Sequence, residues 1–144
     1  MMMFIATVLS LIMLFATICI HYSGLKFISF GARHYDTSSH LVALILLFCI
    51  AFLHLLQIVL YAFAFYLLLN FTDLGSFTSE FKPVLRDYIY FSGANYTTLG
   101  MSDFYPQGHF KIFAVTEALA GFMMLTWSAT FFYSTAGKFL DQDP

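Results

Sequence analysis

Long apolar stretches dominate the pattern of hydrophobic and polar positions along the chain. They run from Met3 to about Ile20, continuing less purely to Phe30, from Leu41 to about Phe71, and from Ile112 to about Tyr133. Each reaches the roughly 20 residues that an α-helix needs to cross the hydrocarbon core of a bilayer. The second is longer, so we expect it to tilt or to project beyond the bilayer. The pattern predicts an all-α integral membrane protein with three transmembrane helices.

The segment between the second and third stretches, Thr72 to Lys111, contains a shorter helical signal. Its first part, through Pro83, has the composition of an aqueous loop, whereas residues 84–97 are rich in aromatic side chains. A helix of that length cannot cross a bilayer. Irregular backbone at membrane depth is tolerated only where protein buries it or where it lines a water-filled cavity. We therefore expect a re-entrant helix over residues 84–97, followed by a polar loop.

Composition supports a membrane location. The 144 residues are 60% hydrophobic and 10% charged, and mean hydropathy is +0.82, whereas soluble domains carry about 25% charged residues. A net charge of −2 with no basic patch gives no reason to expect a nucleic-acid partner. Cys19 and Cys49 lie in apolar stretches far from any Cys-x-x-Cys spacing, so we expect two buried thiols rather than a disulfide or metal pair.

The N-terminus passes directly from Met1 into the first apolar stretch. A signal peptide would begin with a positively charged region, which is missing here. We expect this stretch to be a retained transmembrane helix.

The most distinctive polar motif follows the short helical signal. Residues 97–100 read Thr-Thr-Leu-Gly, Tyr-Phe-Ser precedes them at 90–92, and Asp103 and Pro106 follow in the spacing Asp-x-x-Pro. In the third stretch, Glu117-x-Leu-x-Gly121 precedes Met-x-x-Trp-Ser at 124–128. Together these motifs resemble the pore module of potassium channels, especially the small bacterial three-helix members of the two-transmembrane pore-domain family. The resemblance is strong over about the last third of the chain.

The resemblance implies a tetramer with four-fold symmetry, because four filter loops surround one axis in this family. Residues 1–40 would be a first transmembrane helix and a cytoplasmic loop, and residues 41–144 a pore module. Within that module the outer helix would be 41–71, the pore helix 84–97, the filter 98–103 and the inner helix 111–135. Such loops enter from the outer face, so the N-terminus would lie outside. The implied location is the cell (inner) membrane, as a multi-pass homotetramer in the lipid bilayer.

The resemblance also implies which groups hold the permeant ion. The Thr98 hydroxyl and the carbonyl groups of Thr98, Leu99 and Gly100 match the inner ion sites of the family, and would bind K⁺ or Na⁺ without any other cofactor. The whole candidate filter comprises Thr97, Thr98, Leu99, Gly100, Met101, Ser102 and Asp103.

Two filter residues depart from the family pattern. Met101 replaces an aromatic residue that braces the filter, and Ser102 replaces a second glycine. The backbone there adopts a conformation that is unfavourable for a residue with a Cβ. We expect the outer ion sites to be reshaped and widened, and discrimination between K⁺ and Na⁺ to weaken.

Glu117 is the single charged residue of the third stretch, and ionisable residues inside a membrane are functional by default. We expect Glu117 to face the pore helix and to support the filter by hydrogen bonding Asn95 or a threonine hydroxyl. A polar contact between helices with no role in gating is the alternative. Gly121, four residues further on, lies near the hinge glycine of the family and is the expected bending point for gating.

His54 and Gln57 are three residues apart and share a helix face. No further ligands stand at metal-binding spacing, so a hydrogen bond between helices is the expected use. The other histidines flank the apolar stretches and are expected at the membrane interfaces: His21, His34, His40 and His109.

The expected function is passive flow of monovalent cations. Arg33 and Arg86 are the only arginines, so there is no arginine-rich voltage-sensing helix. The main rival is a non-conducting membrane assembly subunit that retains the pore fold. An enzyme is the weakest alternative, because only His54, Gln57 and Glu117 could supply its polar groups.

Overall fold

The computed structural model describes residues 1–32, 40–78, 83–100 and 104–140. Its helices are α1 (Met2–Ala32), α2 (His40–Phe71), α3 (Leu85–Tyr96) and α4 (Phe110–Leu140). Among these described residues, three helices are long and apolar enough to cross a membrane, over Met2–Ala32, His40–Phe71 and Phe110–Ala136. α4 continues past the expected inner-helix end at residue 135.

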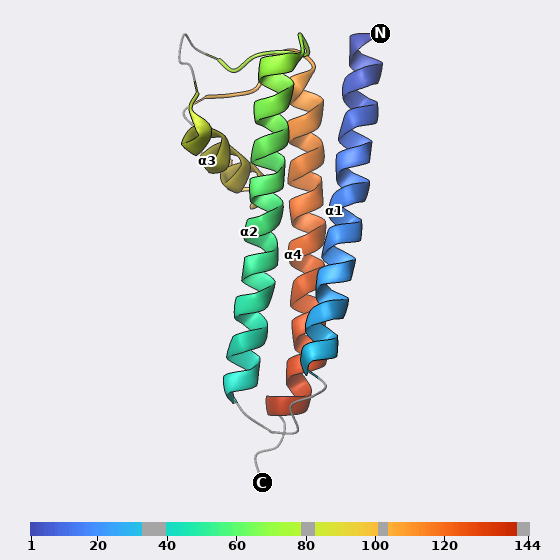
Figure 1. Ribbon diagram of the computed structural model, residues 1–144, viewed down its shortest axis with the longest axis vertical. Helices are drawn as coiled ribbons and strands as arrows, with labels where there is room; N and C mark the ends of the chain where they lie inside the picture. Colours follow the sequence, from blue (N-terminus) through green and yellow to red (C-terminus); the bar gives the residue numbers. More distant parts are fainter. Residues whose placement is uncertain (33–39, 79–82, 101–103, 141–144) are drawn as a thin grey trace.

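The three long helices run side by side, with α2 antiparallel to α1 and α4, as Figure 1 shows. The short helix α3 lies beside α2, in the half of the bundle where α1 begins. α3 contacts α2 and α4, and α1 contacts α4 and α2. The N–H of Val84 donates to Asp87 Oδ2 at 2.8 Å, which satisfies one of the free donors at the start of α3. α3 is therefore a separate short helix held against two of the long helices.

α1 is longer than its apolar stretch and passes through His21 without a break. His21 is fully buried, and its Nε2 lies 3.2 Å from Ser128 Oγ on α4. The expected interface position of His21 is therefore wrong, because α4 supplies a polar partner inside the bundle. His40 and His109 do stand at helix starts, while His34 lies outside the described residues.

The cysteine prediction is also partly wrong. Cys19 is exposed and Cys49 is partly buried, and both are free thiols. Exposure on the surface of a membrane-crossing helix is compatible with an apolar thiol, because hydrocarbon rather than water surrounds it.

α1 and α2 come into close contact at Gly24. A Cβ added at Gly24 would lie 2.7 Å from the methyl groups of Leu53. Small residues allow transmembrane helices to approach closely, and packing rather than hydrophobic transfer then holds them together. Gly24 thus leaves room for the Leu53 side chain between α1 and α2.

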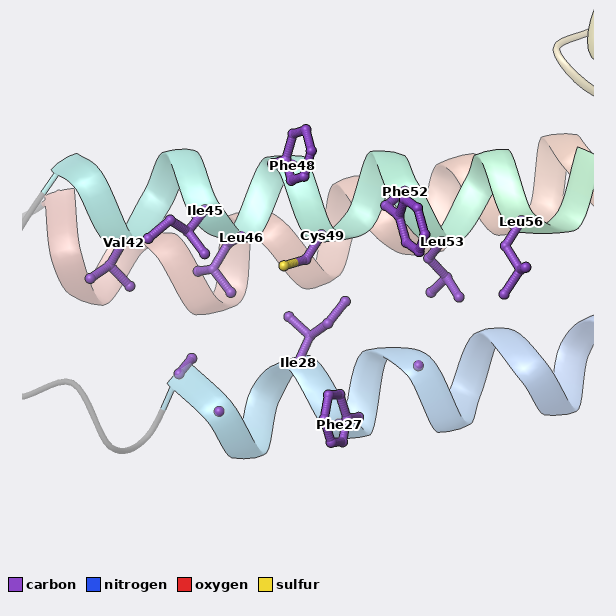
Figure 2. A pocket seen from close by; sticks show the side chains of 13 residues that line it. Phe27, Ile28, Val42, Ile45, Leu46, Phe48, Cys49, Phe52, Leu53 and Leu56 are labelled. Atoms are coloured by element: carbon purple, nitrogen blue, oxygen red, sulfur yellow. The ribbon is translucent and has the colours of Figure 1, made fainter.

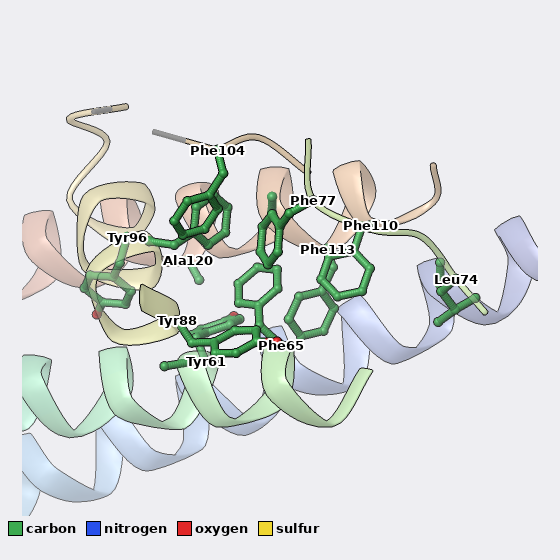
Figure 3. Packing of buried hydrophobic residues seen from close by; sticks show 14 of the residues in the cluster. Tyr61, Phe65, Leu74, Phe77, Tyr88, Tyr96, Phe104, Phe110, Phe113 and Ala120 are labelled. Carbon is green, nitrogen blue, oxygen red and sulfur yellow. The ribbon is translucent and has the colours of Figure 1, made fainter. Parts of the chain in front are cut away.

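An aromatic cluster fills the end of the bundle around α3 (Figure 3). Phe65 of α2 is fully buried, and its ring centroid lies 5.1 Å from that of Phe91 on α3 and 5.0 Å from that of Phe113 on α4. Both pairs are edge-to-face, the arrangement that the aromatic quadrupole favours. The other buried aromatic members are Tyr61, Phe77, Tyr88, Tyr96, Phe104 and Phe110. The cluster joins α3 to both neighbouring helices.

The same cluster holds together the two loops that flank α3. Phe77 and Phe104 have ring centroids 4.8 Å apart, and Phe77 pairs with Pro106 in an isolated β-bridge. The N–H of Gln107 donates to the Ser76 carbonyl at 2.7 Å. A Cβ at Gly75 would lie only 2.2 Å from the Gln107 carbonyl oxygen, so this crossing requires glycine. The segment that leaves the candidate filter is thereby tied to the segment that leads into α3.

Replacing Phe65 by Leu should destabilise this end of the bundle. Loss of edge-to-face contacts of about 0.5–1.5 kcal/mol each leads us to expect a free energy of unfolding lower by about 1–2 kcal/mol. Thermal unfolding in detergent measures the effect. Phe48→Leu, at an exposed position of the same helix, is the matched control, and equal unfolding temperatures for the two variants would contradict the prediction.

Candidate ion-conduction site

The candidate filter begins at the end of α3, where the chain folds back onto the last turn of that helix. Thr97 caps the helix, and its N–H donates to the Gly93 carbonyl at 3.1 Å. The N–H groups of Leu99 and Gly100 both donate to the Ala94 carbonyl, at 2.9 and 3.3 Å. Because these bonds use the free carbonyl groups of the last helical turn, the geometry of the loop follows that of α3.

The backbone of the loop takes an unusual conformation at two positions. Thr98 has φ +60° and Gly100 has φ +66°. The left-handed region suits glycine but strains a β-branched residue, at a cost on the order of 1–3 kcal/mol. Backbone strain of this kind clusters at functional sites. Thr98, Leu99 and Gly100 are also exposed in the single chain, with Leu99 68% exposed.

Glu117 of α4 forms the polar contact behind the loop. It is fully buried, and its two carboxyl oxygens accept hydrogen bonds from Ser92 Oγ and Asn95 Nδ2, each at 2.5 Å. Asn95 also donates to the Ala114 carbonyl at 2.8 Å. The structure thus brings together the expected pair Asn95 and Glu117. Ser92 was not expected as a partner of Glu117, although its spacing of three residues from Asn95 places both on one face of α3.

Gly121 lies at a close approach between α4 and α3. A Cβ at Gly121 would stand 1.9 Å from the Tyr96 carbonyl oxygen, which is backbone and cannot rotate away. α4 runs unbroken through this position. The direct role of Gly121 in this structure is therefore to permit contact between α4 and the end of α3.

His54 and Gln57 of α2 both reach Tyr96, the last residue of α3. The Tyr96 hydroxyl donates to Gln57 Oε1 at 2.5 Å, and His54 Nδ1 lies 3.0 Å from the same hydroxyl. The expected use of this pair in hydrogen bonds between helices is confirmed. Their shared partner immediately precedes the candidate filter.

The remaining filter positions, Met101, Ser102 and Asp103, lie outside the described residues. Within the described part of the chain, no group of three or more His, Cys, Asp or Glu side chains could hold a metal ion. An ion bound at residues 98–100 would have to be held by backbone and hydroxyl oxygens, which suit hard monovalent cations.

A small cavity lies beside the loop, and a larger one lies elsewhere. One of about 130 Å³ is lined by Phe91, Ala94, Asn95, Gly100, Tyr105 and Pro106. A cavity of about 600 Å³ lies between α1 and α2 (Figure 2), with lining side chains such as Phe27, Leu46 and Phe52. Its lining is apolar apart from a thiol, so it offers no groups for catalysis.

Comparison with known proteins agrees with this arrangement. A family model described as "Ion channel" matches residues 41–138, which include α2, α3, the loop and nearly all of α4. No curated protein and no solved structure matches the chain significantly. The matched region is more than half of the chain and holds every element of the candidate site. The chain therefore belongs to the ion-channel family of the two-transmembrane, potassium-channel pore type, and is a membrane channel protein rather than an enzyme.

Proposed function

We propose that this chain forms a homotetrameric cation channel in the cell membrane, in which α3 is a re-entrant pore helix. One loop cannot surround an axis, so four copies of residues 97–103 would form the filter. The strained backbone of Thr98 and the exposure of Thr98, Leu99 and Gly100 together carry the proposal. In the tetramer these residues face the axis, the N-terminus lies outside, and cations flow down their gradient.

The proposal assigns a part to each element of the site. Oxygen atoms of Thr98, Leu99 and Gly100 replace the hydration shell of K⁺ or Na⁺. Asn95 and Glu117 keep α3 at a fixed distance from α4 and so support the filter. Gly121 remains the proposed hinge of α4, and a bend there would act directly on the end of α3, because the Tyr96 carbonyl touches this residue.

Weakened selectivity follows from the outer half of the filter. A serine at position 102 resists the left-handed backbone that the family's second glycine adopts. Met101 is flexible and has only a weakly accepting sulfur, so it cannot brace the filter as a hydrogen-bonding aromatic ring does. Fewer carbonyl sites in series should discriminate less between K⁺ and Na⁺.

Reversal potentials of the purified tetramer in planar bilayers test this proposal. Under a K⁺/Na⁺ bi-ionic gradient we expect a value near zero for the natural chain and a shift toward K⁺ selectivity for the Met101→Tyr, Ser102→Gly double variant. A strongly K⁺-selective natural chain would overturn the weakened selectivity. Absence of current from verified tetramers would instead favour a non-conducting assembly subunit.

A further inference from the structure

Five polar side chains from four helices meet inside the bundle. His21 comes from α1, His54 and Gln57 from α2, Tyr96 from α3 and Ser128 from α4. All but the partly buried His54 are at most 5% exposed. Buried polar groups in membrane-crossing helices are rare and usually functional.

The contacts among these side chains form a continuous chain. Ser128 Oγ lies 3.2 Å from His21 Nε2 and 2.9 Å from His54 Nε2. His54 Nδ1 lies 3.0 Å from the Tyr96 hydroxyl, which donates to Gln57 Oε1. Gln57 Nε2 in turn donates to the Thr17 carbonyl of α1 at 3.2 Å. The chain thus begins and ends on α1.

One set of proton positions satisfies every contact. Because the Tyr96 proton goes to Gln57, His54 must donate from Nδ1 and accept the Ser128 proton at Nε2. Ser128 Oγ then accepts a proton from His21 Nε2. His21 Nδ1 is left as an unprotonated acceptor, and this atom has no hydrogen-bond partner among the described residues. An unpaired acceptor is a smaller penalty than an unpaired donor, so both neutral imidazoles fit.

The backbone of α1 closes this series of hydrogen bonds into a ring. Thr17 and His21 are four residues apart in a continuous helix, so the N–H of His21 donates to the same Thr17 carbonyl that accepts from Gln57. The ring therefore ties two adjacent turns of α1 to α2, α4 and Tyr96. The next residue after Tyr96 is Thr97 of the candidate filter.

We propose that this ring is the means by which α1 positions the filter, with His54 and Tyr96 as its positioning residues. The inference rests on the proposed function, because it takes the loop after Tyr96 to be the filter. It assigns a task to α1, which lies outside the family match at residues 41–138. Tyr96 is the residue that connects the ring to the filter. Its hydroxyl is fixed by α2, its carbonyl touches Gly121 of α4, and the amides after it fold back on α3.

The test uses two isosteric breaks of the ring with matched controls. Tyr96→Phe removes only the central hydroxyl, and Tyr61→Phe removes a buried hydroxyl that is not a member of the ring and has no hydrogen-bond partner at bonding geometry among the described residues. Ser128→Ala cuts the link between the two histidines, and Ser10→Ala removes a buried hydroxyl bonded only within α1. Hydrogen exchange of the Thr97, Leu99 and Gly100 amides in the full tetramer, together with its K⁺/Na⁺ reversal potential, gives two readouts.

Both ring variants should raise exchange of these amides by about tenfold or more, the signature of a locally loosened segment. They should also shift the K⁺/Na⁺ reversal potential. The control variants should change neither the amide exchange nor the reversal potential. Unchanged exchange at these amides, or an equal rise in every helix, would overturn the inference. If the natural chain carries no current, the proposed function fails, while the exchange comparison still decides the role of the ring.

Discussion

Replacing Gly121 by Ala should abolish ion flux and lower the yield of the proposed tetramer. The new methyl group would lie 1.9 Å from the Tyr96 carbonyl oxygen, well inside van der Waals contact. Overpacking usually costs about 1–3 kcal/mol, and more when no flexible side chain can yield. Here the obstacle is backbone, so α4 or the end of α3 must move. Either movement displaces the loop that begins at Thr97.

Size-exclusion chromatography and ion flux from liposomes measure this effect. Gly93→Ala is the matched control, because a Cβ there would meet only Ile58 Cγ2, at 3.8 Å. Alanine should also stabilise the helix slightly, by about 0.5–1 kcal/mol relative to glycine. Normal flux from a Gly121→Ala tetramer would show that α4 separates from α3 in the working channel, contrary to our expectation.

Replacing Glu117 by Ala should produce the second large loss. It leaves the Asn95 amide with one fewer acceptor and opens a space between α3 and α4, where the carboxyl is now fully buried. A buried donor without a partner costs about 1–3 kcal/mol. We expect a lower unfolding temperature and a filter that no longer holds its geometry. Circular dichroism melting and single-channel recording provide the measurements.

Glu117→Gln should restore most of what the alanine variant loses. The Gln oxygen can accept from Asn95 Nδ2, and its amide can donate to Ser92 Oγ. Ser92 can then turn its own proton to the Ile58 carbonyl, which already lies 2.9 Å away. Equal losses in the two variants would mean that a negative charge, rather than hydrogen-bond geometry, is what this position supplies.

The apolar pattern was sufficient to predict the three long helices, because length and hydropathy alone determine whether a segment can cross a bilayer. The contact between Glu117 and Asn95 was also predictable. A single charged residue in an apolar helix needs a polar partner, and few polar side chains are available at that depth. These features depend on local composition.

Other features depend on how the helices are rotated and paired. His21 was expected at an interface because it ends the purest apolar run, and only the position of Ser128 on α4 shows why it is buried. Gly121 was placed by spacing as a hinge, while its contact with the Tyr96 carbonyl is visible only in the packed structure. Hydropathy gives the depth of a residue in the membrane but not the helix face it occupies.

The polar ring can close only late in biosynthesis, after α4 has entered the membrane. His21 and Ser128 are 107 residues apart in the chain, and His54 and Ser128 are 74 apart. Insertion from the N-terminus therefore brings α1 and α2 into the membrane with their polar side chains still lacking these partners. Closing contacts so distant in sequence is slow, since loop-closure entropy opposes them until late. A half-made chain thus holds His21 and His54 without their shared partner, and the arrival of α4 supplies it.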